Sequence, residues 1–220
     1  MFFIEIMDLI GTAAFAISGV LVGIRNKLDL FGIYVLATIT ASGGGLIRDI
    51  ILNKNLPVFF TQPKYLITIT LVTVATCIIA HFAYSFLDKM QMLIKIFDAI
   101  GLGVFTVLAA YGSIQADVPF IGVIFTAILT GVGGGVVRDM MANEVPLIFK
   151  SEIYALASFI GALIFYMLYG VLGVTVNTYL CIFIIFAVRM VSIYFKLNLP
   201  VVRVNNGTLG ESESHENINV

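Results

Sequence analysis

Two copies of one motif, Gly-Gly-Gly-x-x-Arg-Asp, place charged side chains inside apolar segments of this sequence. The first copy consists of Gly43, Gly44, Gly45, Arg48 and Asp49. The second consists of Gly133, Gly134, Gly135, Arg138 and Asp139. Guanidinium and carboxylate groups bind ions, and backbone carbonyls freed near glycines could solvate a cation. Each motif is therefore a candidate ion site.

The glycine triplets predict breaks in the helices that carry them. Each glycine weakens a helix by up to about 1 kcal/mol relative to alanine. Unwound backbone is tolerated in hydrocarbon only where it is buried in protein or lines water. We therefore expect breaks at matching depths in the second and fifth membrane spans. Glycines also permit two helices to approach closely, and this packing interpretation stays open.

The arginine and aspartate of each motif follow the glycines within about one helical turn. A charge at membrane depth costs at least about 2.5–3.5 kcal/mol, so each must be compensated. Neighbouring residues project in different directions on a helix, which favours cross-repeat pairs of Arg48 with Asp139 and of Arg138 with Asp49. Alternatively, each Arg faces a water-filled path while each Asp caps a neighbouring helix, or each Arg snorkels towards the interface.

Other polar residues lie in the same apolar segments. Asp8 and Asp98 are near the starts of the first and fourth spans, where they could interact with a helix N-terminus or line the path. Thr40, Ser42 and Thr130 could offer hydroxyls to a permeating ion, although such hydroxyls commonly bond their own helix backbone.

Composition determines the solvent in which these residues must work. The chain has 220 residues, of which 60% are hydrophobic and only 11% are charged. Soluble domains average near 25% charged, so this chain belongs in lipid. Its net charge of −1 and lack of a basic patch argue against nucleic acid as a partner. No metal or other cofactor site is expected, because Cys77 and Cys181 lack the spacing of metal ligands. No enzymatic nucleophile with a neighbouring base is expected either.

The fold class predicted from hydropathy is an all-α integral membrane protein with seven transmembrane helices. A span needs about 20 apolar residues. We place the spans at 4–23, 30–52, 64–87, 93–112, 118–141, 152–170 and 175–195. Residues 205–220 form a polar tail that is expected to be disordered.

An internal repeat relates the two halves of the chain. A shift of 90 residues aligns Asp8 with Asp98 and superimposes the two motifs. With one residue deleted, Tyr65 meets Tyr154. The repeats are residues 1–87 and 93–170, and residues 175–196 form a seventh helix without a partner. Because three spans is an odd number, the second repeat enters from the opposite side, an arrangement that places a binding site or path near the midplane.

The lysines and arginines predict the orientation of the spans. Two of them, Lys54 and Lys64, lie on one side. The other side carries seven: Arg25, Lys27, Lys89, Lys95, Lys150, Lys196 and Arg203. The positive-inside rule then puts the C-terminus in the cytoplasm and the N-terminus outside.

These features together resemble the bacterial branch of the trimeric intracellular cation channel family. The resemblance rests on ASGGGLIRD (Ala41 to Asp49), GVGGGVVRD (Gly131 to Asp139) and the helix count, and it covers about residues 1–196. It implies a homotrimer in the bacterial plasma membrane, with one pore in each subunit that conducts monovalent cations, chiefly potassium. It implies an hourglass path lined by the two motif helices.

Two functions stay open at this point. In a passive channel, Arg48 and Arg138 would act as electrostatic gates whose charge must be countered before cations pass. Related bacterial sequences are also grouped as putative glycine transporters. In such a transporter the arginines would bind the carboxylate of a small zwitterion, and the aspartates its amine or a coupling ion.

The predicted orientation can be tested by cysteine accessibility. A cysteine in place of Phe2 should react with an impermeant thiol reagent added outside intact cells, because the N-terminus is expected to face outwards. A cysteine in place of Asn206 should react only after the cells are opened. The reverse pattern would show the opposite topology.

Overall fold

The computed structural model describes residues 2–82, 90–150, 153–195 and 197. These residues are helical apart from short connections. The longer helices are α1 (Phe2–Arg25), α2 (Leu30–Ile51), α4 (Pro63–Phe82), α6 (Met90–Gln115), α7 (Phe120–Met141), α9 (Ile153–Leu168) and α10 (Val174–Phe195). Two four-residue helices, α3 (Val58–Thr61) and α8 (Leu147–Lys150), follow α2 and α7.

Six of these helices are long and apolar enough to cross a membrane, which confirms an all-helical, multi-pass membrane protein. The helix at the predicted sixth span, α9, has 16 residues and extends about 24 Å at 1.5 Å per residue. It is apolar but shorter than the other six. The end of the predicted third span and the predicted disordered tail lie outside the described residues.

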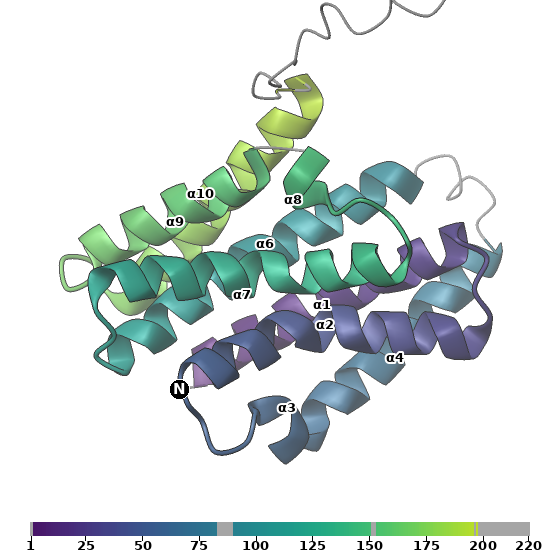
Figure 1. Ribbon diagram of the computed structural model, residues 1–220, viewed down its shortest axis with the longest axis horizontal. Coiled ribbons are helices and arrows are strands. Elements are labelled where there is room, and N and C mark those ends of the chain that lie inside the picture. Colours follow the sequence, from purple (N-terminus) through teal and green to yellow (C-terminus); the bar gives the residue numbers. More distant parts are fainter. Residues whose placement is uncertain (1, 83–89, 151–152, 196, 198–220) are drawn as a thin grey trace, which may run out of the picture.

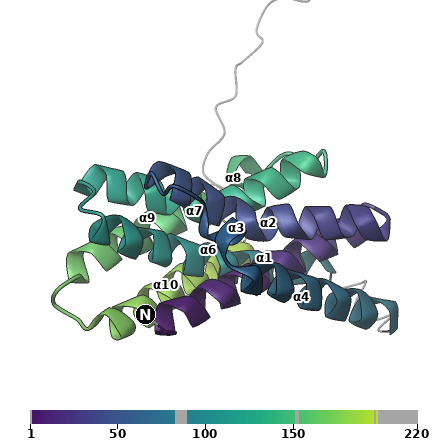
Figure 2. The same cartoon turned by 90° about the horizontal axis from the view of Figure 1, so that it is seen from below.

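Four helices form the centre of the molecule. Helix α1 contacts α6 and α2, and α7 contacts α2 and α6. Figure 1 shows α2 and α7 side by side across the middle, with α1 and α6 behind them. Helix α4 packs on the outer side of α1 and α2, whereas α9 and α10 pack beside α6 and α7, and Figure 2 shows these outer helices at opposite sides of the centre.

The predicted helix breaks at the glycine triplets are wrong. Both α2 and α7 are continuous through Gly43, Gly44, Gly45 and through Gly133, Gly134, Gly135. An unbroken helix keeps its backbone hydrogen bonds internal, which is favoured away from water. The packing interpretation describes the triplets instead, since small residues let helix backbones touch.

The closest approach between α2 and α7 is made by reciprocal contacts. A Cβ atom added to Gly44 would lie closer than 3.0 Å to the Thr130 carbonyl oxygen. One added to Gly134 would lie equally close to the Thr40 carbonyl oxygen. Thr130 and Gly134 are the residues 90 positions after Thr40 and Gly44, so the same contact occurs twice with the partners exchanged.

A second reciprocal contact joins α1 and α6. The rings of Phe15 and Phe105 meet edge to face, with centroids 5.3 Å apart. Each ring packs over a glycine of the facing helix, Phe105 against Gly11 and Phe15 against Gly101. Both phenylalanines are buried and belong to one apolar cluster.

Alanine substitution separates packing from helix propensity. Gly44→Ala should destabilise the protein by about 1–3 kcal/mol, because its methyl group would collide with the backbone of α7. Gly45→Ala is the matched control, since the nearest atom to its Cβ is Arg48 Nη2 at 3.9 Å. It should be neutral or stabilising by up to about 1 kcal/mol. Thermal unfolding in detergent measures both, and equal shifts would contradict the packing argument.

Candidate functional site

The first motif forms a charge cluster at the C-terminal end of α2. Arg48 Nε donates to Asp49 Oδ1 at 2.9 Å, and Arg48 Nη1 lies 3.8 Å from Asp8 Oδ1 on α1. The Tyr65 hydroxyl on α4 donates to Asp8 Oδ2 at 2.6 Å. The Lys54 ammonium lies 2.9 Å from Asp49 Oδ1. Three helices therefore converge on one buried arginine.

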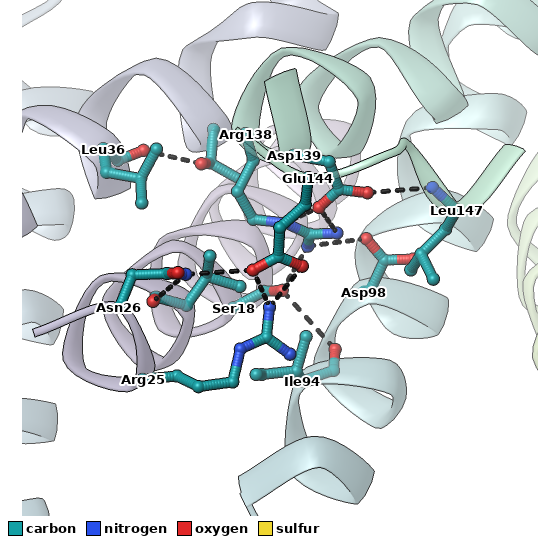
Figure 3. A network of polar contacts seen from close by, with 12 residues as sticks. Ser18, Arg25, Asn26, Leu36, Ile94, Asp98, Arg138, Asp139, Glu144 and Leu147 are labelled. Atoms are coloured by element: carbon teal, nitrogen blue, oxygen red, sulfur yellow. Dashed lines mark hydrogen bonds and ion pairs between the residues drawn. The ribbon is translucent and has the colours of Figure 1, made fainter. Parts of the chain in front are cut away.

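The second motif forms the corresponding cluster at the C-terminal end of α7 (Figure 3). Arg138 Nε donates to Asp139 Oδ1 at 2.9 Å. Arg138 Nη1 donates to Asp98 Oδ1 on α6 at 2.8 Å and to Ser18 Oγ on α1 at 2.5 Å. Arg138 and Asp98 are both fully buried, so their charges are compensated within the protein.

The expected cross-repeat pairs of Arg48 with Asp139 and of Arg138 with Asp49 are wrong. Each Arg pairs with the Asp next to it in the chain, because its Nε atom lies close enough to the backbone to reach a neighbouring carboxylate. Snorkelling is also excluded, since Arg48 is 8% exposed and Arg138 is 0% exposed.

The two aspartates of the motifs cap the short helices, as one of the sequence interpretations anticipated. Asp49 Oδ2 accepts from the Val58 N–H at 2.8 Å, and Asp139 Oδ2 accepts from the Leu147 N–H at 2.9 Å. The residue before each N–H donor is a proline, which has no side-chain oxygen to act as a cap. Each carboxylate therefore joins an arginine to the helix that follows.

Asp8 and Asp98 do not interact with a helix N-terminus, and that expectation is wrong. Only the first four N–H groups of a helix lack an intrahelical partner. Asp8 lies seven residues into α1 and Asp98 nine residues into α6. Both instead face the motif arginines. The sequence identifies Tyr65 and Tyr154 only as repeat partners, because the fold alone brings them to Asp8 and Asp98.

Two cavities approach the clusters from opposite ends of α1 and α6. The first, of about 600 Å³, is lined by Glu5, Asp8, Arg48 and residues near the end of α6 such as Gln115. The second, of about 250 Å³, is lined by Arg138, Asp139 and residues of the other ends: Val22, Arg25, Gln91, Ile94 and Lys95. A small space beside Asp8 and Ser42 extends from the first cluster to Phe105.

The packed layer between the clusters consists of the reciprocal contacts described above. It contains Phe15, Phe105 and the touching backbones of α2 and α7. The hydroxyls of Thr40 and Ser42 bond carbonyls one turn back in α2. Thr130 is buried, and its hydroxyl has no hydrogen-bond partner within the part of the chain that the structure describes.

An ion pair lies at the mouth of the second cavity. Arg25 Nη2 contacts Glu144 Oε1 at 2.5 Å, and Asn26 Nδ2 donates to the same oxygen at 3.0 Å (Figure 3). Both charged side chains line this cavity and are about one-third exposed. The corresponding positions at the first cavity are Gln115 and Lys54, so this contact distinguishes the two mouths.

Comparisons with known proteins agree on the family. A family model described as "Glycine transporter" matches residues 5–81 and 95–170. The chain is 34% identical to the membrane protein YvgT of Bacillus subtilis, across 89% of this chain and 95% of that protein. It is also 34% identical to the inner membrane protein YadS of Escherichia coli, across 88% and 93% of the two chains.

Solved structures share the fold over most of the chain. A prokaryotic TRIC channel crystallised in 0.5 M KCl superimposes with a TM-score of 0.83 at 32% identity, across 89% of this chain and 98% of that one. The trimeric intracellular cation channel orthologue of Rhodobacter sphaeroides gives 0.82 at 28% identity, across 88% and 98%. With its duplicated motif on paired helices, the chain therefore belongs to the bacterial branch of the trimeric intracellular cation channel family.

Proposed function

We propose that this protein is a potassium-permeable monovalent cation channel with one path in each subunit. The observation that carries this proposal is the pair of cavities at opposite ends of α1 and α6, each reaching a motif arginine. The path would run along α2 and α7 between them and would be constricted at the packed layer. In the structure described here, that layer separates the two cavities.

The reciprocal contacts support an inverted repeat. Exchanged partners, as between Gly44 and Thr130 and between Gly134 and Thr40, are what a two-fold axis between similar units produces. Because α1 places Asp8 at one cavity and Val22 at the other, the axis would lie in the membrane plane. In this proposal α9 is the sixth span and α10 the unpaired seventh.

The charge balance of each cluster is compatible with cation passage. Arg48 faces the carboxylates of Asp8 and Asp49, and Arg138 faces those of Asp98 and Asp139. In the first cluster two carboxylates balance Arg48 and Lys54, whose ammonium lies beside Asp49, and in the second two carboxylates face Arg138. Neither arginine therefore presents an uncompensated positive barrier. Carboxylates at a pore favour cations over anions, and the glutamate Glu5 adds another at the first cavity.

The family assignment supports the remaining parts of the proposal. We infer a homotrimer, since a structural neighbour is described as trimeric, embedded in the bacterial inner membrane as its relative YadS is named. The C-terminus would face the cytoplasm by the distribution of lysines and arginines. No enzymatic activity is proposed.

A second candidate, transport of glycine or a similar zwitterion, is favoured by one arrangement. Asp8 and Arg48 face the same cavity, so one carboxylate and one guanidinium could bind an ammonium and a carboxylate together. The description of the matching family model points the same way.

Bilayer recording distinguishes the two candidates. A channel should give discrete openings in potassium chloride, at rates of about millions of ions per second. An alternating-access cycle is limited by domain motions of microseconds to milliseconds or longer. Liposomes that contain the same protein should release potassium when no glycine is present in the solution. Saturable glycine uptake without openings would support the transporter.

Neutralising one carboxylate tests whether the first cluster lies on the path. Asp8→Asn should lower potassium conductance by about tenfold or more, equivalent to about 1.4 kcal/mol, because a charge that counters Arg48 is lost. Glu5→Gln is the matched control, since Glu5 lines the outer part of the same cavity and pairs with Lys64. Glu5→Gln should lower potassium conductance less than Asp8→Asn does. Equal currents in Asp8→Asn and wild type would show that Asp8 does not lie on the path.

A further inference from the structure

Helix α10, which has no counterpart in the repeat, brings a buried cation to the second cluster. Arg189 is 1% exposed. Its guanidinium carbon lies 4.5 Å from the centroid of the Tyr154 ring on α9. A cation over an aromatic face is attracted by the ring electrons, and more strongly where both are removed from water. Arg189 therefore contacts a tyrosine that is itself buried.

Tyr154 in turn lies beside Asp98. A Cβ atom added to Gly135 would be 2.7 Å from the Tyr154 hydroxyl and 3.0 Å from Asp98 Oδ1, so both oxygens flank the same point. Asp98 Oδ1 also accepts from Arg138. Arg189, Tyr154, Asp98 and Arg138 thus follow one another from α10 to the motif arginine, and the buried Tyr154 hydroxyl makes no hydrogen bond within the described residues.

The first cluster lacks this support and is more open. Its tyrosine, Tyr65, donates to Asp8 and lines the larger cavity. The cation over the Tyr65 ring is Lys64, at 5.5 Å, and its side chain is 30% exposed. The two halves therefore hold equivalent tyrosines with unequal cations, one partly exposed at a cavity and one buried on α10.

We propose that Arg189 is a positioning residue that keeps the second cluster in its closed arrangement. It does so by holding Tyr154 against Asp98, so that α10 controls the narrower half of the path. This inference rests on the proposed channel function for its effect on current.

Potassium efflux from liposomes with the full-length protein tests the inference. Arg189→Met should raise efflux by about fivefold or more, since it releases Tyr154. Arg189→Lys, which keeps the charge, should stay nearer to wild type. Val191→Met, at an exposed position of the same helix, is the control and should stay within about twofold of wild type.

A double-mutant cycle separates positioning from general loosening. Tyr154→Phe keeps the ring but removes the hydroxyl that faces Asp98, and should itself raise efflux. In the Tyr154→Phe variant, adding Arg189→Met should raise potassium efflux by less than a further factor of about two. A full additional increase there, or unchanged efflux in both single variants, would overturn the inference.

A second readout does not depend on conduction. Ile94 lines the second cavity, and an Ile94→Cys variant, with Cys77→Ala and Cys181→Ser, reports its accessibility to a small cationic thiol reagent. Arg189→Met or Tyr154→Phe should raise the modification rate by about fivefold. Unchanged rates would overturn the inference even if the protein conducts.

If wild type gives no efflux above that of empty liposomes, the channel proposal fails, and the modification rate alone decides the inference. Where Arg189→Met does not yield folded protein, Tyr154→Phe decides the same question.

Discussion

The close contact between α2 and α7 is the constraint on which the rest of the structure depends. The backbones touch where Gly44 faces Thr130 and Gly134 faces Thr40. Side chains at either glycine would push the helices apart, and the arginines one turn later would lose their partners on α1 and α6. The glycines are therefore needed because they have no side chain to separate the helices, and both helices stay continuous through them.

That contact also determines where charge can be tolerated. Arg48 and Arg138 follow the contact and reach carboxylates from two or more helices, so neither needs bulk water for compensation. The halves then differ in their surroundings. The first cluster opens to a large cavity, and the second is enclosed by α9 and α10 and has an ion pair at its mouth.

Much of the fold could be predicted because hydropathy and repetition are properties of the sequence itself. Six of the seven predicted spans are long apolar helices, and most of the helix ends lie within a few residues of the predicted ones. The partner of each arginine could not be predicted in this way. Adjacent residues on a helix project in different directions, but an arginine side chain is long enough to reach the residue next to it. The glycine triplets were ambiguous, because weakened helix propensity and close packing use the same residue. Arg189 gave one signal, a charge inside the predicted span 175–195, but its contact with Tyr154 could not be predicted because Tyr154 comes from another helix.

The capping aspartates have a mechanical consequence. Each carboxylate holds an arginine with one oxygen and the first N–H of a short helix with the other. Those short helices, α3 and α8, each carry an exposed phenylalanine, Phe60 and Phe149. Any displacement of α3 or α8 is therefore transmitted to the arginine of the same half through the two oxygens of one carboxylate.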